Sequence, residues 1–152
     1  MAGTTLLCLA AAPALAQQSP PQQRFDPEVR VDAILAGTDA VHGGVGITVP
    51  LGNYVRSGVV VAGGWSRDGA SGRVDLFSRF HLDPFREHRW APYGGGGISG
   101  RFDDARRTRV YLLAFVGLDG PVFGGAVPAV EAGFGGGARI GVILRRAAPN
   151  RR

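Results

Sequence analysis

The most regular feature of the sequence is an alternation between apolar and polar positions with a period of two residues. In the segment 72–82, the apolar Val74 and Leu76 share one face of an extended chain, and the charged Arg73 and Asp75 share the other. Successive side chains of a β-strand point to opposite faces, so this pattern predicts strands with one apolar and one polar face. The pattern predicts eight strands, at residues 28–37, 41–49, 54–66, 72–82, 90–100, 108–118, 126–134 and 138–146.

Short runs of turn-forming residues separate the eight segments. Examples are Pro50–Asn53, with Pro, Gly and Asn, and Gly135–Gly137. Runs of this length join antiparallel neighbours, and no long helical periodicity is present. Pro128 interrupts the seventh segment, where its missing N–H marks a bulge or moves the start of the strand to Ala129. The predicted fold class is all-β, an eight-stranded antiparallel up-and-down barrel.

Period-two alternation alone does not tell which face points inward, but three features favour an apolar exterior. The polar face combines arginines with acids and many glycines, as charged side chains crossing a narrow interior require. Aromatic residues such as Tyr54, Trp65 and Trp90 gather towards strand ends, which suits the two membrane interfaces. The segments also approach the roughly 9–11 residues that a tilted strand needs to cross the hydrocarbon layer. The prediction is therefore a transmembrane β-barrel.

The N-terminus has the form of a secretory signal peptide, predicted at residues 1–16. Its apolar run ends in Ala-Leu-Ala and is shorter than the roughly 20 residues of a membrane-spanning helix. Cys8 lacks the small residue expected before a lipidated cysteine, and no other cysteine exists for a disulfide or a thiolate metal site. The remaining organisation is predicted as a disordered leader at 17–27, the barrel at 28–146 and a disordered tail at 147–152.

With eight strands, short turns and a signal peptide, the chain resembles the small bacterial outer-membrane β-barrel proteins, the OmpA-like and OmpX-like group. The likeness covers about residues 28–146, and its one local motif is Ala91-Pro92-Tyr93-Gly94-Gly95-Gly96-Gly97. The sequence departs from the family at its C-terminus, where AAPNRR replaces the usual terminal aromatic residue. The resemblance implies an outer-membrane location in a Gram-negative envelope, a closed polar interior, and roles in envelope integrity, adhesion or defence evasion. It brings no catalytic residues.

The polar faces supply a predicted network of charged side chains inside the barrel. An eight-stranded barrel has an interior just wide enough for its own side chains, so pairing of these charges closes it. Six arginines face three acids in this set, which predicts that some arginines reach water at the rims or stack on Phe77 or Tyr111. The predicted members are Arg30, Asp32, Arg56, Arg73, Asp75, Arg79, Arg109, Glu131 and Arg139.

No arrangement of residues points to catalysis, a metal or a cofactor, so the protein is expected not to be an enzyme. His42 and His81 lie on polar strand faces, where hydrogen bonds to Asp32 or Asp75 account for them. All 17 basic residues are arginines, and most of them stand singly along the alternating segments, which argues against nucleic-acid binding despite the net charge of +5. The expected partners are outer-membrane lipid and the outer-membrane assembly machinery, and the expected state is a monomer.

A soluble periplasmic barrel of the lipocalin type is the alternative prediction. It inverts the two faces and places an apolar small molecule inside the barrel. The residues that would line this ligand site are Val59, Val61, Leu76, Phe80, Leu112 and Val142.

Overall fold

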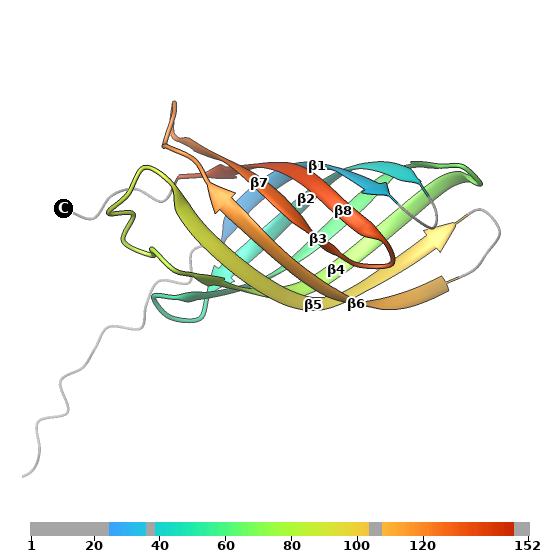
Figure 1. The fold of residues 1–152 in the computed structure, drawn as a ribbon, viewed down its shortest axis with the longest axis horizontal. Coiled ribbons are helices and arrows are strands. Elements are labelled where there is room, and N and C mark those ends of the chain that lie inside the picture. The colour runs from blue at the N-terminus through green and yellow to red at the C-terminus, as the bar shows by residue number, and fades with distance from the viewer. Residues whose placement is uncertain (1–24, 36–38, 104–107, 148–152) are drawn as a thin grey trace, which may run out of the picture.

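The computed structural model describes residues 25–35, 39–103 and 108–147, which fold into one closed β-barrel (Figure 1). Each strand pairs antiparallel with its neighbour in the chain, and the first strand pairs with the last. The predicted fold class, an eight-stranded antiparallel up-and-down barrel, is confirmed. The strands are β1 (Asp26–Leu35), β2 (Ala40–Pro50), β3 (Val55–Ser66), β4 (Gly69–His81), β5 (Ala91–Asp103), β6 (Thr108–Asp119), β7 (Ala126–Phe134) and β8 (Ala138–Arg146).

The strand boundaries lie close to those predicted from the alternation. The largest difference at a strand start is in β4, which begins at Gly69 rather than at residue 72, because Arg67 and Asp68 alone form the turn after β3. Gly69 has a positive φ of 113°, a conformation that glycine adopts without a steric penalty. The predicted signal peptide lies outside the described residues. Among the described residues, no helix is long and apolar enough to cross a membrane.

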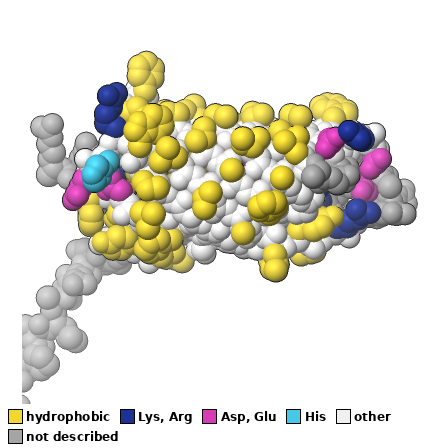
Figure 2. Space-filling view, viewed as in Figure 1, with side chains coloured by type: hydrophobic (Ala, Val, Ile, Leu, Met, Phe, Trp, Pro, Cys, Tyr) yellow, Lys and Arg dark blue, Asp and Glu magenta, His cyan; other side chains and the backbone are white. Residues whose placement is uncertain are grey.

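The outer face of each strand is apolar, and the charged side chains point inward, where they share the interior with a cluster of buried apolar residues that includes Phe77 and Phe115. On the outer wall, Val61 is 56% exposed and Leu112 is 84% exposed, whereas Asp32 and Asp75 are completely buried inside. Figure 2 shows apolar side chains spread over the wall, with charged side chains gathered at the two ends of the barrel. This arrangement contradicts the lipocalin-type alternative, because the residues proposed to line its ligand site lie on the exterior. They are Val59, Val61, Leu76, Phe80, Leu112 and Val142.

Pro128 does not shorten β7. The strand runs through it and pairs with β8, with Pro128 opposite Leu144. On the other side, pairing with β6 begins one residue later, at Ala129 opposite Asp119. The carbonyl of Pro128 still accepts a hydrogen bond of 2.7 Å from the N–H of Gly120. The missing N–H of proline therefore lies where the ladder between β6 and β7 has already ended.

The two ends of the barrel differ in the loops that close them. β1 begins and β8 ends at one end, which we call the termini end, and the opposite end is the far end (Figure 1). The termini end carries the connections 51–54, 82–90 and 120–125. At the far end, the connections described throughout are the shorter 67–68 and 135–137.

Glycines on the inner face leave space for long side chains. A Cβ atom at Gly117 would overlap the ring of Tyr93, and one at Gly141 would overlap the carboxylate of Asp32. Larger residues at these positions would displace side chains that carry charge or hydrogen bonds in the interior. At other inner-face positions, such as Gly64 and Gly97, an added Cβ would instead overlap a backbone carbonyl of the neighbouring strand, so glycine there permits the close approach of two strands.

Candidate functional site

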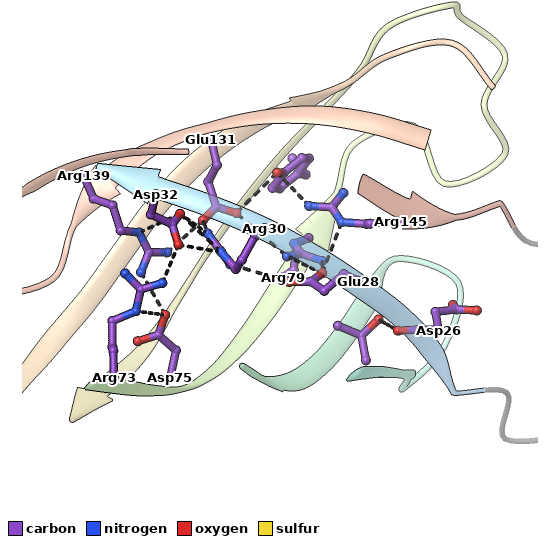
Figure 3. A network of polar contacts seen from close by, with 12 residues as sticks. Asp26, Glu28, Arg30, Asp32, Arg73, Asp75, Arg79, Glu131, Arg139 and Arg145 are labelled. Atoms are coloured by element: carbon purple, nitrogen blue, oxygen red, sulfur yellow. Dashed lines mark hydrogen bonds and ion pairs between the residues drawn. The ribbon is translucent and has the colours of Figure 1, made fainter. Parts of the chain in front are cut away.

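The interior of the barrel holds a connected set of buried charged side chains, which we call the lumen network (Figure 3). These side chains come from β1, β4, β6, β7 and β8, so the network joins segments far apart in the sequence. Its members are Glu28, Arg30, Asp32, Arg73, Asp75, Arg79, Asp119, Glu131, Arg139 and Arg145.

Asp32 on β1 is the point where three strands meet. Its carboxylate accepts a hydrogen bond of 2.9 Å from Nη2 of Arg30 on the same strand and one of 2.5 Å from Nη2 of Arg73 on β4. Nε of Arg139, on β8, lies 3.9 Å away. Three guanidinium groups thus compensate one carboxylate that has no contact with solvent, as a buried charge requires.

Asp75 on β4 forms a second bridge across the interior. Its carboxylate lies 3.1 Å from Nε of Arg73 and accepts a hydrogen bond of 2.8 Å from Nη1 of Arg139. The hydroxyl of Ser99, on β5, donates a third bond of 2.6 Å. Arg73 and Arg139 each contact both Asp32 and Asp75, so these four residues form a closed group of two cations and two anions.

Glu131 on β7 links this group to the termini-end half of the interior. Arg30 and Arg139 donate hydrogen bonds of 2.6 and 2.8 Å to its Oε1. The hydroxyl of Tyr93 donates to Oε2 at 3.3 Å, and Nη2 of Arg79 lies 3.8 Å from the same oxygen. Without Glu131, Arg30, Arg79 and Arg139 would therefore lose the carboxylate that they share.

Glu28 and Asp119 balance the arginines nearest the termini end. Glu28 accepts hydrogen bonds of 3.3 Å from Arg79 and from Nε of Arg145. Nη1 of Arg30 lies 3.5 Å from the other oxygen of Glu28, and Nη1 of Arg145 donates to Asp119. The ion pairs therefore continue without interruption from the middle of the barrel to its termini end.

Aromatic rings stack against two of the guanidinium groups. Cζ of Arg79 lies 4.9 Å from the ring centroid of Phe77 and 5.0 Å from that of Tyr93. Cζ of Arg145 lies 4.7 Å from the ring centroid of Tyr93, and Nη2 of Arg145 donates a hydrogen bond of 2.8 Å to the Tyr93 hydroxyl. The predicted stacking of an arginine on Phe77 is confirmed. Cation–π contacts thus supplement the ion pairs that Arg79 and Arg145 form with carboxylates.

The structure places seven of the nine predicted network residues together in the interior: Arg30, Asp32, Arg73, Asp75, Arg79, Glu131 and Arg139.

The other two predicted members, Arg56 and Arg109, lie at opposite ends of the barrel. Arg56 is at the termini end, where its side chain is 31% exposed and pairs with Asp26 at 2.8 Å. Arg109 is exposed, and its prediction as a network member is wrong. It follows the inward alternation of β6, but pairing of β6 with β7 stops at Ala114, so no wall encloses Arg109.

Sequence reasoning missed three members of the network, Glu28, Asp119 and Arg145. They change its charge balance, because the network contains five arginines and five carboxylates instead of six arginines and three acids. The alternation did place Arg145 on the same face as Arg139, so the signal was present for this residue. Asp119 closes β6, at a position that the sequence assigned to a turn.

The histidines and serines inside the barrel form no complete catalytic group. Nε2 of His42 lies 2.6 Å from the hydroxyl of Ser71, rather than bonding a carboxylate as predicted. Asp32 faces His42 across the β1–β2 ladder, but its oxygens are occupied by arginines. His81 lies 3.7 Å from Asp119. Among the described residues, no group of histidine, cysteine or carboxylate side chains is arranged to hold a metal ion.

Three solved structures share this architecture. The solution NMR structure of the de novo designed TMB2.3 matches with a TM-score of 0.58 and 16% identity, over 84% of this chain and 96% of that chain. A structure titled "De novo design of transmembrane beta-barrels" matches with a TM-score of 0.55 and 15% identity, over 80% of this chain and 92% of that chain. The N-terminal β-barrel domain of Pseudomonas aeruginosa OprF matches with a TM-score of 0.53 and 15% identity, over 80% of this chain and 96% of that chain. No family model matches the sequence, and no curated protein matches it.

These similarities and the inside-out distribution of polarity define the class of the protein. It has the fold of the small eight-stranded transmembrane β-barrels. At the level of the fold, the resemblance to the OmpA-like group holds, since the OprF barrel has the same architecture over 80% of this chain.

Proposed function

We propose that the protein is an outer-membrane β-barrel with a structural role in a Gram-negative-type envelope, and that its interior is closed and performs no catalysis. The observation that carries this proposal is the inversion of polarity. Ion pairs are buried in the interior beside an apolar cluster, while valine, leucine, isoleucine and aromatic side chains cover the outside. A wall of this kind is stable in lipid, whereas in water it would be a large exposed apolar surface.

The same features support the proposed outer-membrane location. The only membrane-spanning structures that satisfy all backbone polar groups in lipid are helices and closed barrels, and closed barrels of this size are typical of outer membranes. The signal peptide predicted at residues 1–16 supports export to that compartment. The proposed partners of the protein are outer-membrane lipid and the assembly machinery that inserts such barrels, and the protein acts as a monomer.

The lumen network supports a closed interior. Asp32, Asp75 and Glu131 bridge arginines of different strands across the barrel, so solutes or ions would have to break these pairs in order to pass. Separating a buried pair leaves an uncompensated charge, which costs about 3–5 kcal/mol. The barrel therefore supports the envelope through its wall and its exposed ends rather than through a channel.

The conductance of planar lipid bilayers tests the closed interior. The refolded chain is first checked for a heat-dependent shift in gel mobility, which reports a folded barrel. We expect no steady channel current from the folded protein, and we expect brief openings to become more frequent in the Asp75→Ala variant, which loses the carboxylate shared by Arg73 and Arg139. A large, steady current from the unmodified protein would contradict the proposal.

A further inference from the structure

All three connections at the termini end carry a bulky apolar residue that points away from the barrel. Leu51, in the connection 51–54, is 63% exposed. Phe85, in the connection 82–90, is 66% exposed, and Phe123, in the connection 120–125, is 82% exposed. Figure 2 shows that apolar side chains continue from the wall onto this end of the molecule. Single exposed apolar residues are common in water, but an apolar surface that extends over several loops marks contact with a membrane or a partner.

The far end has the opposite composition. Its described connections consist of Arg67 and Asp68 after β3, and of three glycines, Gly135–Gly137, after β7. Arg67 also forms an exposed ion pair with Asp39, at 2.5 Å. In the part of the chain that the structure describes, no far-end connection carries a large apolar side chain. The contrast between the two ends is therefore a property of the loops and not only of the strands.

The loop between β4 and β5 holds Phe85 outward by specific contacts. Asp83 accepts hydrogen bonds from the backbone N–H groups of His88, at 2.9 Å, and Glu87, at 3.0 Å, and these bonds hold the pKa of its carboxyl below the usual value. Arg86 has a positive φ of 56° and donates a bond of 2.5 Å to the carbonyl of Gly120. The two contacts fix the backbone on both sides of Phe85, so its exposure is not a result of a loose loop.

Phe85 also continues an aromatic row that begins on the barrel wall. Tyr54 stacks on Phe80 of β4 with 5.8 Å between ring centroids, and Phe85 meets Tyr54 edge-on at 6.4 Å. The row thus joins the outer wall, which faces lipid in the proposed function, to the tip of the loop. This continuity indicates that the same apolar phase contacts both.

We propose that the three termini-end loops insert Leu51, Phe85 and Phe123 into the membrane leaflet on that side, at the boundary between head groups and acyl chains. The partner is the phospholipid leaflet itself, and the far end stands in water. This inference rests on the proposed function and adds to it the position of the barrel along the membrane normal. Apolar and aromatic side chains at this depth bury their apolar part, while the polar side chains of Glu87 and His88 in the same loop reach the aqueous phase.

Single-cysteine variants test the inference, because Cys8 is the only cysteine of the chain. In the full chain carrying Cys8→Ser, one cysteine is introduced by Phe85→Cys and labelled with an environment-sensitive fluorophore. Glu87→Cys is the matched control, since Glu87 is exposed in the same loop. Two further loop labels, from Leu51→Cys and Phe123→Cys, are compared with a far-end label from Asp68→Cys. The proteins are folded into phosphatidylcholine vesicles that contain nitroxide-bearing lipid or, separately, an aqueous quencher.

The inference predicts that the labels at positions 51, 85 and 123 are quenched by the lipid nitroxide and protected from the aqueous quencher. The labels at 87 and 68 should show the reverse. Equal access of the aqueous quencher to all five labels would overturn the inference, and it would indicate that a protein partner, absent from these vesicles, covers the loops. A wall label from Val61→Cys separates the two proposals: if lipid quenches it while the loop labels stay in water, the membrane barrel stands and only the inference fails. If the wall label also stays in water, both fail.

The two native tryptophans allow a test without labels. Trp90 is the last residue of the termini-end connection 82–90, and Trp65 lies near the far end. Trp90 is observed alone in a Trp65→Phe background, and Trp65 in a Trp90→Phe background. Replacing the three apolar loop residues by serine (L51S/F85S/F123S) is expected to reduce quenching of Trp90 by lipid nitroxide, since the loops lose their apolar contact with the leaflet. Unchanged quenching of Trp90 would contradict a role of these residues in setting the depth of the barrel.

Discussion

The two faces of β4 show how one strand serves two different environments. Outward, Leu76 is half exposed, and inward, Arg73 and Asp75 are completely buried and paired with each other. A soluble protein of the same pattern would place these faces the other way round. The wall is stabilised by its surroundings, which accept any apolar side chain, whereas the interior is stabilised by particular partners. The wall should therefore tolerate any substitution that stays apolar, whereas the interior should tolerate few substitutions of any kind.

The largest effect is expected from removing a shared carboxylate inside the barrel. Asp32→Ala leaves the guanidinium groups of Arg30 and Arg73 buried without their shared partner, and we expect the free energy of unfolding to fall by about 3–5 kcal/mol. Urea-induced unfolding in lipid vesicles measures this loss of free energy.

The control for this variant is Asp39→Ala, which breaks the exposed pair with Arg67 and should cost less than about 1 kcal/mol. Similar losses of stability in the two variants would mean that the interior charges are as well solvated as those on the surface.

A charge on the wall should have the next largest effect. Val61 lies near the middle of β3 and faces outward, so Val61→Arg places a guanidinium in the hydrocarbon layer. We expect a loss of about 2–4 kcal/mol in the free energy of unfolding from vesicles. The same change at an exposed turn, Asp68→Arg, should stay within about 0.5 kcal/mol. A barrel that accepts arginine equally well at both positions has no lipid against its wall.

Glycine substitutions compare the space available on the two faces. Gly117→Ala adds a methyl group against the ring of Tyr93 and should destabilise the barrel by about 1–3 kcal/mol, as overpacking does. Gly43 faces outward with no atom within 4 Å of an added Cβ, so Gly43→Ala should be neutral or slightly stabilising. The difference in urea midpoint between the two variants measures the effect, and its absence would mean that the interior is loosely packed.

Removing one hydroxyl from the network should have a moderate effect. Tyr93→Phe keeps the ring that stacks on Arg79 and Arg145 but loses the hydrogen bonds to Arg145 and Glu131. We expect a loss of about 1 kcal/mol in the free energy of unfolding. A much larger loss would show that the hydroxyl, rather than the ring, organises the arginines around it.

The smallest effect is expected at Arg109, which the sequence assigned to the interior and the structure places at the rim. Arg109→Ala should change the free energy of unfolding by no more than about 0.5 kcal/mol. A loss comparable to that of Asp32→Ala would restore the original assignment of this residue to the network.

The sequence predicts the fold well because the alternation is local. Each strand reveals its two faces through its own residues, and closure of the barrel follows from eight such strands joined by short turns. The choice of the outward face also follows from the sequence, because a face rich in arginine, acids and glycine suits a narrow interior.

Membership of the lumen network is harder to predict at the strand ends. Arg109 and Arg145 both follow the inward alternation, yet only Arg145 is enclosed, since it pairs with Glu28 on one side and Val127 on the other. Arg109 lies beyond the point where β7 pairs with β6. Whether an inward residue is buried depends on the stagger between strands, which is a property of the closed barrel and not of any one segment.

Fractionation of cells that express the chain tests the central claim most directly, namely that the apolar face contacts lipid and the charged face is enclosed. The account predicts recovery in the outer membrane, release by detergent only, and a band whose gel mobility changes on heating. Recovery as a soluble periplasmic monomer whose mobility does not depend on heating would contradict it.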